Sequence, residues 1–307
     1  MIAQSLSKKL TAHLSLLEPD GMSLFMLENK SIRGALLNGT EMVARMKANH
    51  ELGIMESLIL GHAYLGAGLI SRMLKGEDRI VLSVECGGPV KGLSVEVNAA
   101  GNIRGYLKES HLQIDHEPDS FDTSPFFGPG FLSVTKHIAG NGNPFTGQVM
   151  LEHGTLAKDL VHYFHTSEQI RTAVILSVFF DRQGEVSGAG GLFLQAMPEA
   201  GDEALKKIEN GIIQMPSLGK YFAAGNKRKD FIDNHFSGFG PEYTEEQEVR
   251  FYCSCSKERF SAFLSSISDN EKMSILTDKD FPLKTTCFNC NTTYEFPEKE
   301  IHTLFSN

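Results

Sequence analysis

The chain has 307 residues, with 29 Lys or Arg and 38 Asp or Glu, so its formal net charge is −9. Hydrophobic residues make up 41% and charged residues 22%, as in ordinary soluble proteins, which excludes collagen-like, low-complexity and wholly disordered chains. A chain of this length can bury a core without disulfide bonds.

The most apolar long stretch runs from Leu52 to Leu74. It is interrupted by Glu56, His62 and Arg72, so it lacks the ~20 uninterrupted apolar residues of a bilayer span, and we predict no transmembrane helix and no membrane partner. The N-terminal residues also lack the continuous apolar stretch of a secretory signal, and we expect a cytoplasmic protein. Thiols are reduced in that compartment, so the five cysteines indicate metal binding or redox chemistry instead of a disulfide framework.

The spacing of apolar residues predicts the helices and strands of the first domain, residues 1–198. From Leu52 they recur every three or four positions, which indicates an amphipathic helix ending near Gly76, and its glycines would let another element approach closely. After that helix, apolar residues recur at every second position, which is typical of strands. Strands are predicted at 79–86, 93–97, 103–107, 131–135, 146–151, 173–180 and 186–195, with a helix at 155–165. Short turns join the strands and the helices stand apart, so we predict an α+β fold with packed helices on a largely antiparallel sheet.

Residues 199–248 have a different composition. Glycines separate short amphipathic pieces, none of which is long enough to form a stable helix alone. We interpret this segment as a helical, metastable linker that must pack against another part of the protein to be ordered. It ends with an acidic run that we expect on a solvated surface, namely Glu242, Glu245, Glu246 and Glu248.

Four of the five cysteines lie in two close pairs within residues 249–307. Cys253 and Cys255 are separated from Cys287 and Cys290 by 31 residues. Two cysteines two or three positions apart can place both sulfurs on one ion, and two such pairs complete the tetrahedron of structural zinc. We therefore predict a small C-terminal zinc-binding domain with one Zn²⁺ per chain. Its folding would depend on the metal, which contributes about 10–16 kcal/mol in zinc-finger peptides.

The same sulfurs are also able to undergo redox chemistry. Two neighbouring thiols can form a disulfide once an oxidant converts one of them to a sulfenic acid. The cysteines could thus hold the domain together when reduced and trigger its unfolding when oxidised. The spacing by itself establishes only this capacity.

Several further motifs accompany the cysteine pairs. In the C-terminal part they are Cys253-Ser254-Cys255-Ser256-Lys257-Glu258-Arg259, Cys287-Phe288-Asn289-Cys290 and Tyr294-Glu295-Phe296. In the N-terminal part they are Gly87-Gly88-Pro89, Gly101-Asn102-Ile103-Arg104-Gly105-Tyr106, Tyr163-Phe164 and Ala189-Gly190-Gly191-Leu192-Phe193-Leu194-Gln195. In this order the motifs resemble the 33-kilodalton redox-regulated heat-shock chaperone family, over almost the whole chain. Asn291 departs from the pattern, because members commonly have glycine there, but the change removes no ligand.

The resemblance implies a redox-regulated, ATP-independent holdase with no catalytic site. In the reduced state such a protein is zinc-bound and inactive. Oxidation, typically with heat, forms disulfides, here expected as Cys253–Cys255 and Cys287–Cys290, and zinc leaves. The small domain then melts, the linker loosens, and apolar surface binds unfolding client proteins. The resemblance also implies a homodimer after activation.

Four phenylalanines of the linker are candidate client contacts, namely Phe222, Phe231, Phe236 and Phe239. Apolar residues that become exposed are suited to such binding. The alternative interpretation is that these rings simply fix the linker to its domain.

The two alternatives to a chaperone are a zinc-dependent nucleic-acid binder and a thiol–disulfide oxidoreductase. A zinc-dependent nucleic-acid binder would need a basic surface, yet residues 250–307 hold seven basic and eight acidic residues, a side-chain charge of −1. We therefore expect no nucleic-acid partner. A thiol–disulfide oxidoreductase would need its reactive thiolate on a helix within a βαβ unit, which the sequence around Cys287 does not indicate. The fifth cysteine, Cys86, ends a predicted strand and is interpreted as a small buried residue.

Overall fold

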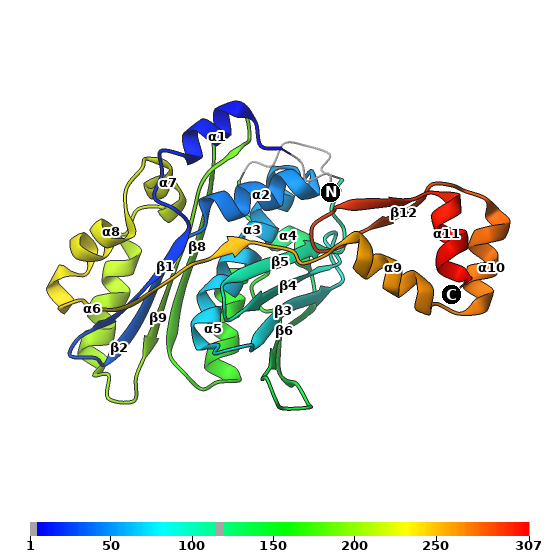
Figure 1. The fold of residues 1–307 in the computed structure, drawn as a ribbon. Helices are drawn as coiled ribbons and strands as arrows, with labels where there is room; N and C mark the ends of the chain where they lie inside the picture. Colours follow the sequence, from blue (N-terminus) through cyan, green and yellow to red (C-terminus); the bar gives the residue numbers. More distant parts are fainter. Residues whose placement is uncertain (1–4, 114–119, 307) are drawn as a thin grey trace.

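The computed structural model describes residues 5–113 and 120–306, and these form three β-sheets (Figure 1). A five-stranded sheet has the order β10 (Glu242–Gln247), β1 (Gly21–Leu27), β2 (Ile32–Asn38), β9 (Val186–Ala196), β8 (Thr172–Phe180). A six-stranded sheet has the order β11 (Arg250–Phe251), β5 (Asn102–Leu107), β4 (Gly92–Asn98), β3 (Arg79–Cys86), β6 (Gly130–His137), β7 (Phe145–Met150). The third sheet is the hairpin of β12 (Leu283–Thr286) and β13 (Thr293–Phe296).

All neighbouring strands in the described residues pair antiparallel except β11 with β5, which are parallel. The predicted α+β class and its largely antiparallel sheet are confirmed. The strands expected from apolar alternation at residues 79–107, 131–151 and 173–195 all form. Cys86 is only half-buried at the end of β3, so its interpretation as a buried residue is wrong.

The long helix α3 (Ile54–Ile70) lies between the two large sheets and packs against strands of both. Its glycines provide the close approach expected of them, since a Cβ on Gly68 would lie 2.6 Å from Leu37 and one on Gly66 would lie 2.9 Å from Leu160. Residues 54–73 have the length and hydropathy of a membrane span, but 89% of the apolar window is buried inside the protein. The segment is therefore the core helix of the domain.

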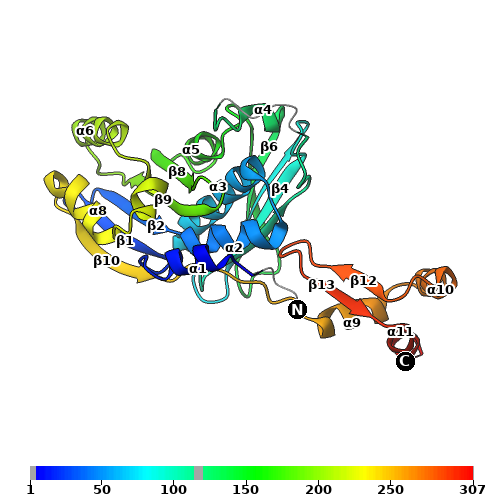
Figure 2. The ribbon, with the colours of Figure 1, turned by 90° about the horizontal axis from the view of Figure 1, so that it is seen from above.

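Shorter helices complete this domain. They are α1 (Lys8–Leu14), α2 (Thr40–His50), the 3-10 turn η1 (Ser71–Met73), α4 (Ser124–Phe127) and α5 (Leu156–Thr166). Helix α2 packs on α3 and on β9, and its C-terminal end points towards the C-terminal part of the chain (Figures 1 and 2). This end contacts the turn between β12 and β13.

The linker is ordered by packing on the five-stranded sheet, on the face opposite α3 (Figures 1 and 2). It forms α6 (Asp202–Ile213), α7 (Leu218–Ala223), α8 (Arg228–His235) and the 3-10 turn η2 (Ser237–Phe239). Phe222, Phe231 and Phe236 are almost completely buried against the sheet, while Phe239 is partly buried. A Cβ on Gly190 of β9 would lie 2.5 Å from the Phe222 ring, so this glycine leaves the space that the ring fills.

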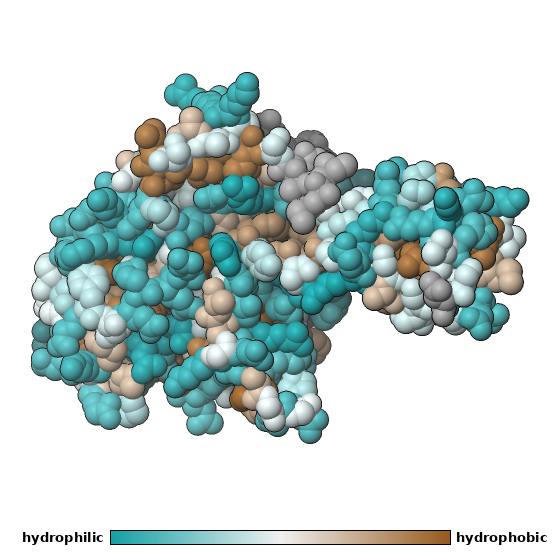
Figure 3. All heavy atoms as spheres, in the orientation of Figure 1, coloured by the Kyte–Doolittle hydropathy of each residue, from teal (hydrophilic) through white to brown (hydrophobic). Residues whose placement is uncertain are grey.

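The end of the linker is not helical, which corrects one part of the prediction. The acidic run forms β10, which pairs with β1 at the edge of the five-stranded sheet, from Met22 opposite Gln247 to Met26 opposite Glu242. Its side chains are mostly exposed, as expected for a solvated run, and hydrophilic residues dominate the face shown in Figure 3. The backbone could pair despite the charges because edge strands tolerate exposed charged side chains.

The C-terminal module forms a separate lobe at one end of the molecule (Figures 1, 2 and 3). It consists of α9 (Lys257–Ser266), α10 (Asp269–Asp278), the β12–β13 hairpin and α11 (Glu298–Phe305). Its apolar cluster has four buried side chains, from Leu264, Tyr294, Phe296 and Ile301. So small a core gives the module little stability of its own.

The buried position of the Phe222 ring predicts that this side chain contributes strongly to the stability of the linker on its sheet. We expect Phe222→Ala to lower the free energy of unfolding by about 3–5 kcal/mol, because a large cavity replaces the ring. Chemical denaturation would measure the loss, and limited proteolysis within residues 199–248 would locate it. The matched control is Ile213→Ala, since Ile213 is 75% exposed on α6. Equal stability of the two variants would show that Phe222 does not fix the linker.

Candidate metal centre

The first cysteine pair is placed by the chain that leaves the linker. After β10, the buried Val249 enters the main core, and β11 then runs beside β5. The Arg250 N–H donates to the Gly101 carbonyl at 2.9 Å and the Tyr252 N–H donates to the Ile103 carbonyl at 3.0 Å. This pairing carries Cys253 to the outer face of β5, and Cys255 follows directly before α9.

The second pair lies in the tight turn between β12 and β13. The Asn291 N–H donates to the Cys287 carbonyl at 2.7 Å, and the Cys287 N–H donates to the Thr292 carbonyl at 2.9 Å. Asn291 has a φ of 54°, in the left-handed region that favours glycine but that asparagine also adopts. Asparagine therefore preserves the turn at the position where the sequence departs from the family pattern.

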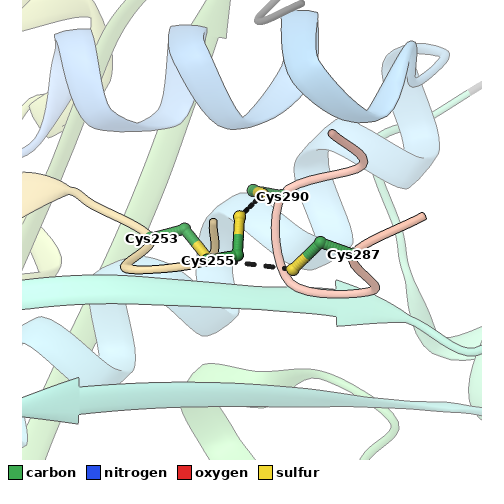
Figure 4. A group of neighbouring side chains, drawn as sticks. All are labelled: Cys253, Cys255, Cys287 and Cys290. Carbon is green, nitrogen blue, oxygen red and sulfur yellow. Dashed lines mark hydrogen bonds between the residues drawn. The ribbon is translucent and has the colours of Figure 1, made fainter. Parts of the chain in front are cut away.

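The structure brings the four predicted cysteines together (Figure 4). All four sulfurs lie within 4.8 Å of one another. The Cys253 and Cys287 sulfurs are 3.8 Å apart, and the Cys255 and Cys290 sulfurs are 3.3 Å apart. Four sulfurs bound to Zn²⁺ at about 2.3 Å would be separated by about 3.8 Å at the edges of a regular tetrahedron. The donor set and its spacing therefore fit a metal ion, and all five cysteines of the chain are free thiols.

Four thiols this close cannot all ionise without a cation, because like charges repel. Hydrogen bonds from the Cys287 and Cys290 thiols lower the pKa of Cys253 far below its ordinary value. Burial raises the pKa of Cys255 to about 11, and the hydrogen bond to Cys253 raises the pKa of Cys287 to about 11. The pKa of Cys290 is also strongly raised by its hydrogen bonds to Cys253 and Cys287. A divalent cation would remove this conflict by stabilising four thiolates together.

Polar groups surround the sulfurs. The Tyr294 hydroxyl lies 3.2 Å from the Cys255 sulfur and donates to the Cys255 carbonyl at 3.1 Å. The Thr292 hydroxyl oxygen lies 3.3 Å from the Cys290 sulfur, and the Arg104 Nη1 lies 3.7 Å from the Cys253 sulfur. Such partners orient metal ligands and tune their basicity.

The turn that holds the second pair also contacts the core domain. The Asn291 side chain donates to the Asn49 carbonyl at 3.0 Å, and the His50 Nε2 lies 3.3 Å from the Asn289 carbonyl, both at the end of α2. Burial lowers the pKa of His50 and so favours its neutral form. In that form one ring nitrogen donates a hydrogen bond and the other accepts one. The Phe288 ring contacts the Tyr106 ring of β5 at a centroid distance of 5.7 Å.

Sequence reasoning missed these core partners of the cysteine site. Arg104 and Tyr106 belong to a motif that contributes only to the family resemblance. Nothing in the sequence around Asn49 and His50 indicates a contact with the cysteines. The contacts join residues more than 140 positions apart, so spacing within a motif could not reveal them. The structure also places Cys287 and Cys290 in a turn between antiparallel strands, which is not the helix terminus expected of a thiol–disulfide oxidoreductase.

Comparisons with known proteins find relatives that match most of the chain. The sequence profile of the family described as "Hsp33 protein" matches residues 20–297. A "33 kDa chaperonin" of Lactiplantibacillus plantarum is 34% identical over 281 residues, which cover 91% of this chain and 94% of the relative. A protein of the same name from Bacillus licheniformis is 32% identical over 275 residues, which cover 89% of this chain and 94% of the relative.

A solved structure shares the fold. The crystal structure of the 33 kDa chaperonin from Thermotoga maritima, described as a heat shock protein 33 homologue, matches with a TM-score of 0.85 and 26% identity. The match covers 94% of this chain and 98% of the other. The similarity thus includes the large domain, the linker and the C-terminal module.

The sulfur geometry predicts which cysteines hold metal. We expect Cys255→Ser to reduce bound zinc to well under one equivalent, because three thiolates and a hydroxyl form a weaker site. Elemental analysis of protein purified under reducing conditions measures the content. Cys86→Ser is the matched control and should keep the zinc of the unchanged chain, since Cys86 lies outside the cluster. The same zinc content in both variants would contradict the four-sulfur site.

Proposed function

The chain belongs to the Hsp33 protein family, and from this premise we propose that it is a redox-regulated, ATP-independent holdase chaperone. Its curated relatives are named chaperonins, which supports the binding of unfolding proteins and not catalysis. The observation that carries the regulatory part is the convergence of four sulfurs at the point where the linker joins the C-terminal module.

In the reduced state, we propose that Cys253, Cys255, Cys287 and Cys290 hold one Zn²⁺ as thiolates. The ion would supply a cross-link between two chain segments and would neutralise part of their negative charge. The segments need this cross-link because the module buries only a small apolar cluster. The protein is inactive in this state, since the linker helices cover the apolar face of the five-stranded sheet.

Oxidation would remove the ligands. A cysteine thiolate attacks one oxygen of hydrogen peroxide, which gives a sulfenic acid and hydroxide, and a neighbouring thiol then displaces water to form the disulfide. Each disulfide takes two electrons from sulfur and reduces one peroxide to two waters once the hydroxide is protonated. Two peroxides therefore convert all four cysteines into disulfides, which are neutral and bind zinc poorly.

We propose the pairing Cys253–Cys255 and Cys287–Cys290. The contacts of 3.8 Å between the Cys253 and Cys287 sulfurs and 3.3 Å between the Cys255 and Cys290 sulfurs each join one cysteine of the first pair to one of the second, while all four sulfurs lie within 4.8 Å of one another. The local pairs are favoured as soon as the module loosens, because they join cysteines two or three positions apart instead of closing loops of more than thirty residues.

Loss of the cross-link would destabilise the linker through the residues that directly precede Cys253. Residues 242–252 pair with β1 in one sheet and with β5 in the other. When they separate from these edges, α6, α7 and α8 lose their C-terminal attachment. The surface that opens contains the four candidate client contacts and the sheet residues beneath them, namely Phe25, Leu27, Ile32, Leu36, Leu192 and Leu194.

The remaining parts of the proposal concern assembly and location. We propose domain limits at 1–198, 199–248 and 249–307, a homodimer in the activated state, and a cytoplasmic location, where thiols are normally reduced. Unfolding proteins are the proposed partners, and neither nucleic acid nor membrane is among them. The acidic balance of residues 250–307 supports the exclusion of nucleic acid.

The redox switch predicts linked changes in metal and activity. We expect peroxide with mild heat to release the bound zinc and to start suppression of client aggregation, because disulfide formation removes the ligands. Light scattering of a heat-unfolding client and a zinc-sensitive dye would follow both events in the same sample. Protein kept in dithiothreitol is the control and should retain zinc and leave aggregation at the rate of the client alone.

Two results would contradict this function. Oxidised, zinc-free protein that lets the client aggregate at the control rate would exclude the holdase activity. Full activity in the reduced, zinc-bound protein would exclude the redox switch. Peptide mapping of the oxidised chain would separately test the proposed disulfide pairs.

A further inference from the structure

Arg104 of β5 joins the core domain to the sulfur cluster. Its Nε and Nη2 donate to the Glu96 Oε1 on β4 at 3.1 Å and 2.7 Å. Its Nη1 lies 3.7 Å from the Cys253 sulfur and 3.5 Å from the Ser254 hydroxyl. The side chains of Arg104 and Glu96 are 22% and 26% exposed, so this ion pair is largely shielded from solvent. Glu96 thus fixes the guanidinium in an orientation that presents one nitrogen to a predicted metal ligand.

Arg104 is the middle of three β5 residues that hold the C-terminal part of the chain. Alternate residues of a strand point to the same face, and here Asn102, Arg104 and Tyr106 do so. The Asn102 side chain accepts from the Arg250 Nε at 2.8 Å, and Tyr106 contacts Phe288. The strand β11 pairs with β5 over only two residues. Asn102 and Arg104 therefore add to the backbone pairing and to the packing of Phe251 on Tyr64 that keep residues 250–254 against the core, while Tyr106 contacts the turn of the second cysteine pair.

The charge next to Arg104 depends on the oxidation state of the sulfurs. Four thiolates on one divalent cation carry a net charge of −2, whereas two disulfides carry none. Arginine remains protonated in both states. The attraction between the guanidinium and the Cys253 sulfur is therefore present in the reduced protein and disappears on oxidation.

We propose that Arg104 is a positioning residue that senses the charge of the sulfur cluster. It holds residues 250–254 on β5 while the sulfurs are metal-bound thiolates, and it releases them when the sulfurs become disulfides. Its hydrogen bond also lowers the basicity and nucleophilicity of the Cys253 thiolate, which slows both the protonation that would release it from the metal and its attack on peroxide. This inference rests on the proposed redox function, and it identifies how a change at sulfur reaches the linker.

The test compares three variants of the full chain in the reduced, zinc-loaded state. Arg104→Gln removes the charge, Arg104→Lys keeps a charge without the planar fork, and Arg79→Gln is the matched control. Arg79 also lies near Glu96, at 3.8 Å, but its side chain is 49% exposed. Zinc transfer to a chelator and amide hydrogen exchange of residues 250–253 are the two measurements, and neither depends on chaperone activity.

We expect Arg104→Gln to lose zinc to the chelator about 10-fold faster, the lower end of the range for partners of metal ligands. Exchange at the Arg250 and Tyr252 amides should accelerate in the same variant. Arg104→Lys should fall between it and the unchanged chain, while Arg79→Gln should stay within about twofold of the unchanged chain because exposed ion pairs contribute little. Added salt should accelerate zinc transfer in the unchanged chain more than in Arg104→Gln.

Two outcomes would overturn the inference. One is zinc transfer and amide exchange in Arg104→Gln equal to those of the unchanged chain. The other is an equal acceleration in Arg79→Gln, which would assign the effect to Glu96 alone. If Arg104→Gln does not fold, the Arg104→Lys variant decides, since rates equal to those of the unchanged chain would show that orientation of the guanidinium by Glu96 towards Cys253 is not needed and would overturn the positioning role. Failure of the proposed function is distinct, because the unchanged chain would then lack zinc or fail to protect clients after oxidation.

Discussion

The convergence of four sulfurs on one centre is the constraint on which the C-terminal module depends. One pair lies just before α9 and the other in the β12–β13 turn, and all four sulfurs lie within 4.8 Å. The apolar cluster of the module contributes little burial, so a cross-link between its two chain segments is needed to hold them together. Four thiolates held so closely also require a cation, because their charges would otherwise repel.

Residues 242–255 extend the effect of this centre to the rest of the molecule. They complete the edge of the five-stranded sheet as β10, pass through the core at Val249, and join the six-stranded sheet as β11 before they reach Cys253. The linker helices lie immediately before them and cover an apolar face of the first sheet. In the proposed switch, a chemical change at the sulfurs would alter the pairing of both sheet edges and uncover that apolar face, because one short segment of the chain connects all three.

Sequence patterns predicted the strands of the six-stranded sheet well, apart from the two-residue β11, because its inner face is buried and its outer face is polar. β4, for example, alternates between buried and partly exposed residues over most of its length. No helix or strand was predicted in residues 1–51, where the structure forms β1, β2 and α2 among others. β2 is buried at nearly every position, so its apolar residues do not alternate. β10 was missed because glutamates are uncommon in strands and the strand is held mainly by its pairing with β1.

The sequence by itself determined which four cysteines are the candidate metal ligands, because two cysteines two or three positions apart are covalently constrained to lie close enough to reach a common ion. It also determined the α+β class, since the periods of apolar residues follow directly from the geometry of strands and helices. Only the tertiary structure decided that the two cysteine pairs face each other, that Arg104 and the end of α2 contact them, and that the linker phenylalanines are covered. These contacts join distant parts of the chain, and their energies come from packing and charge in three dimensions, which local sequence does not record.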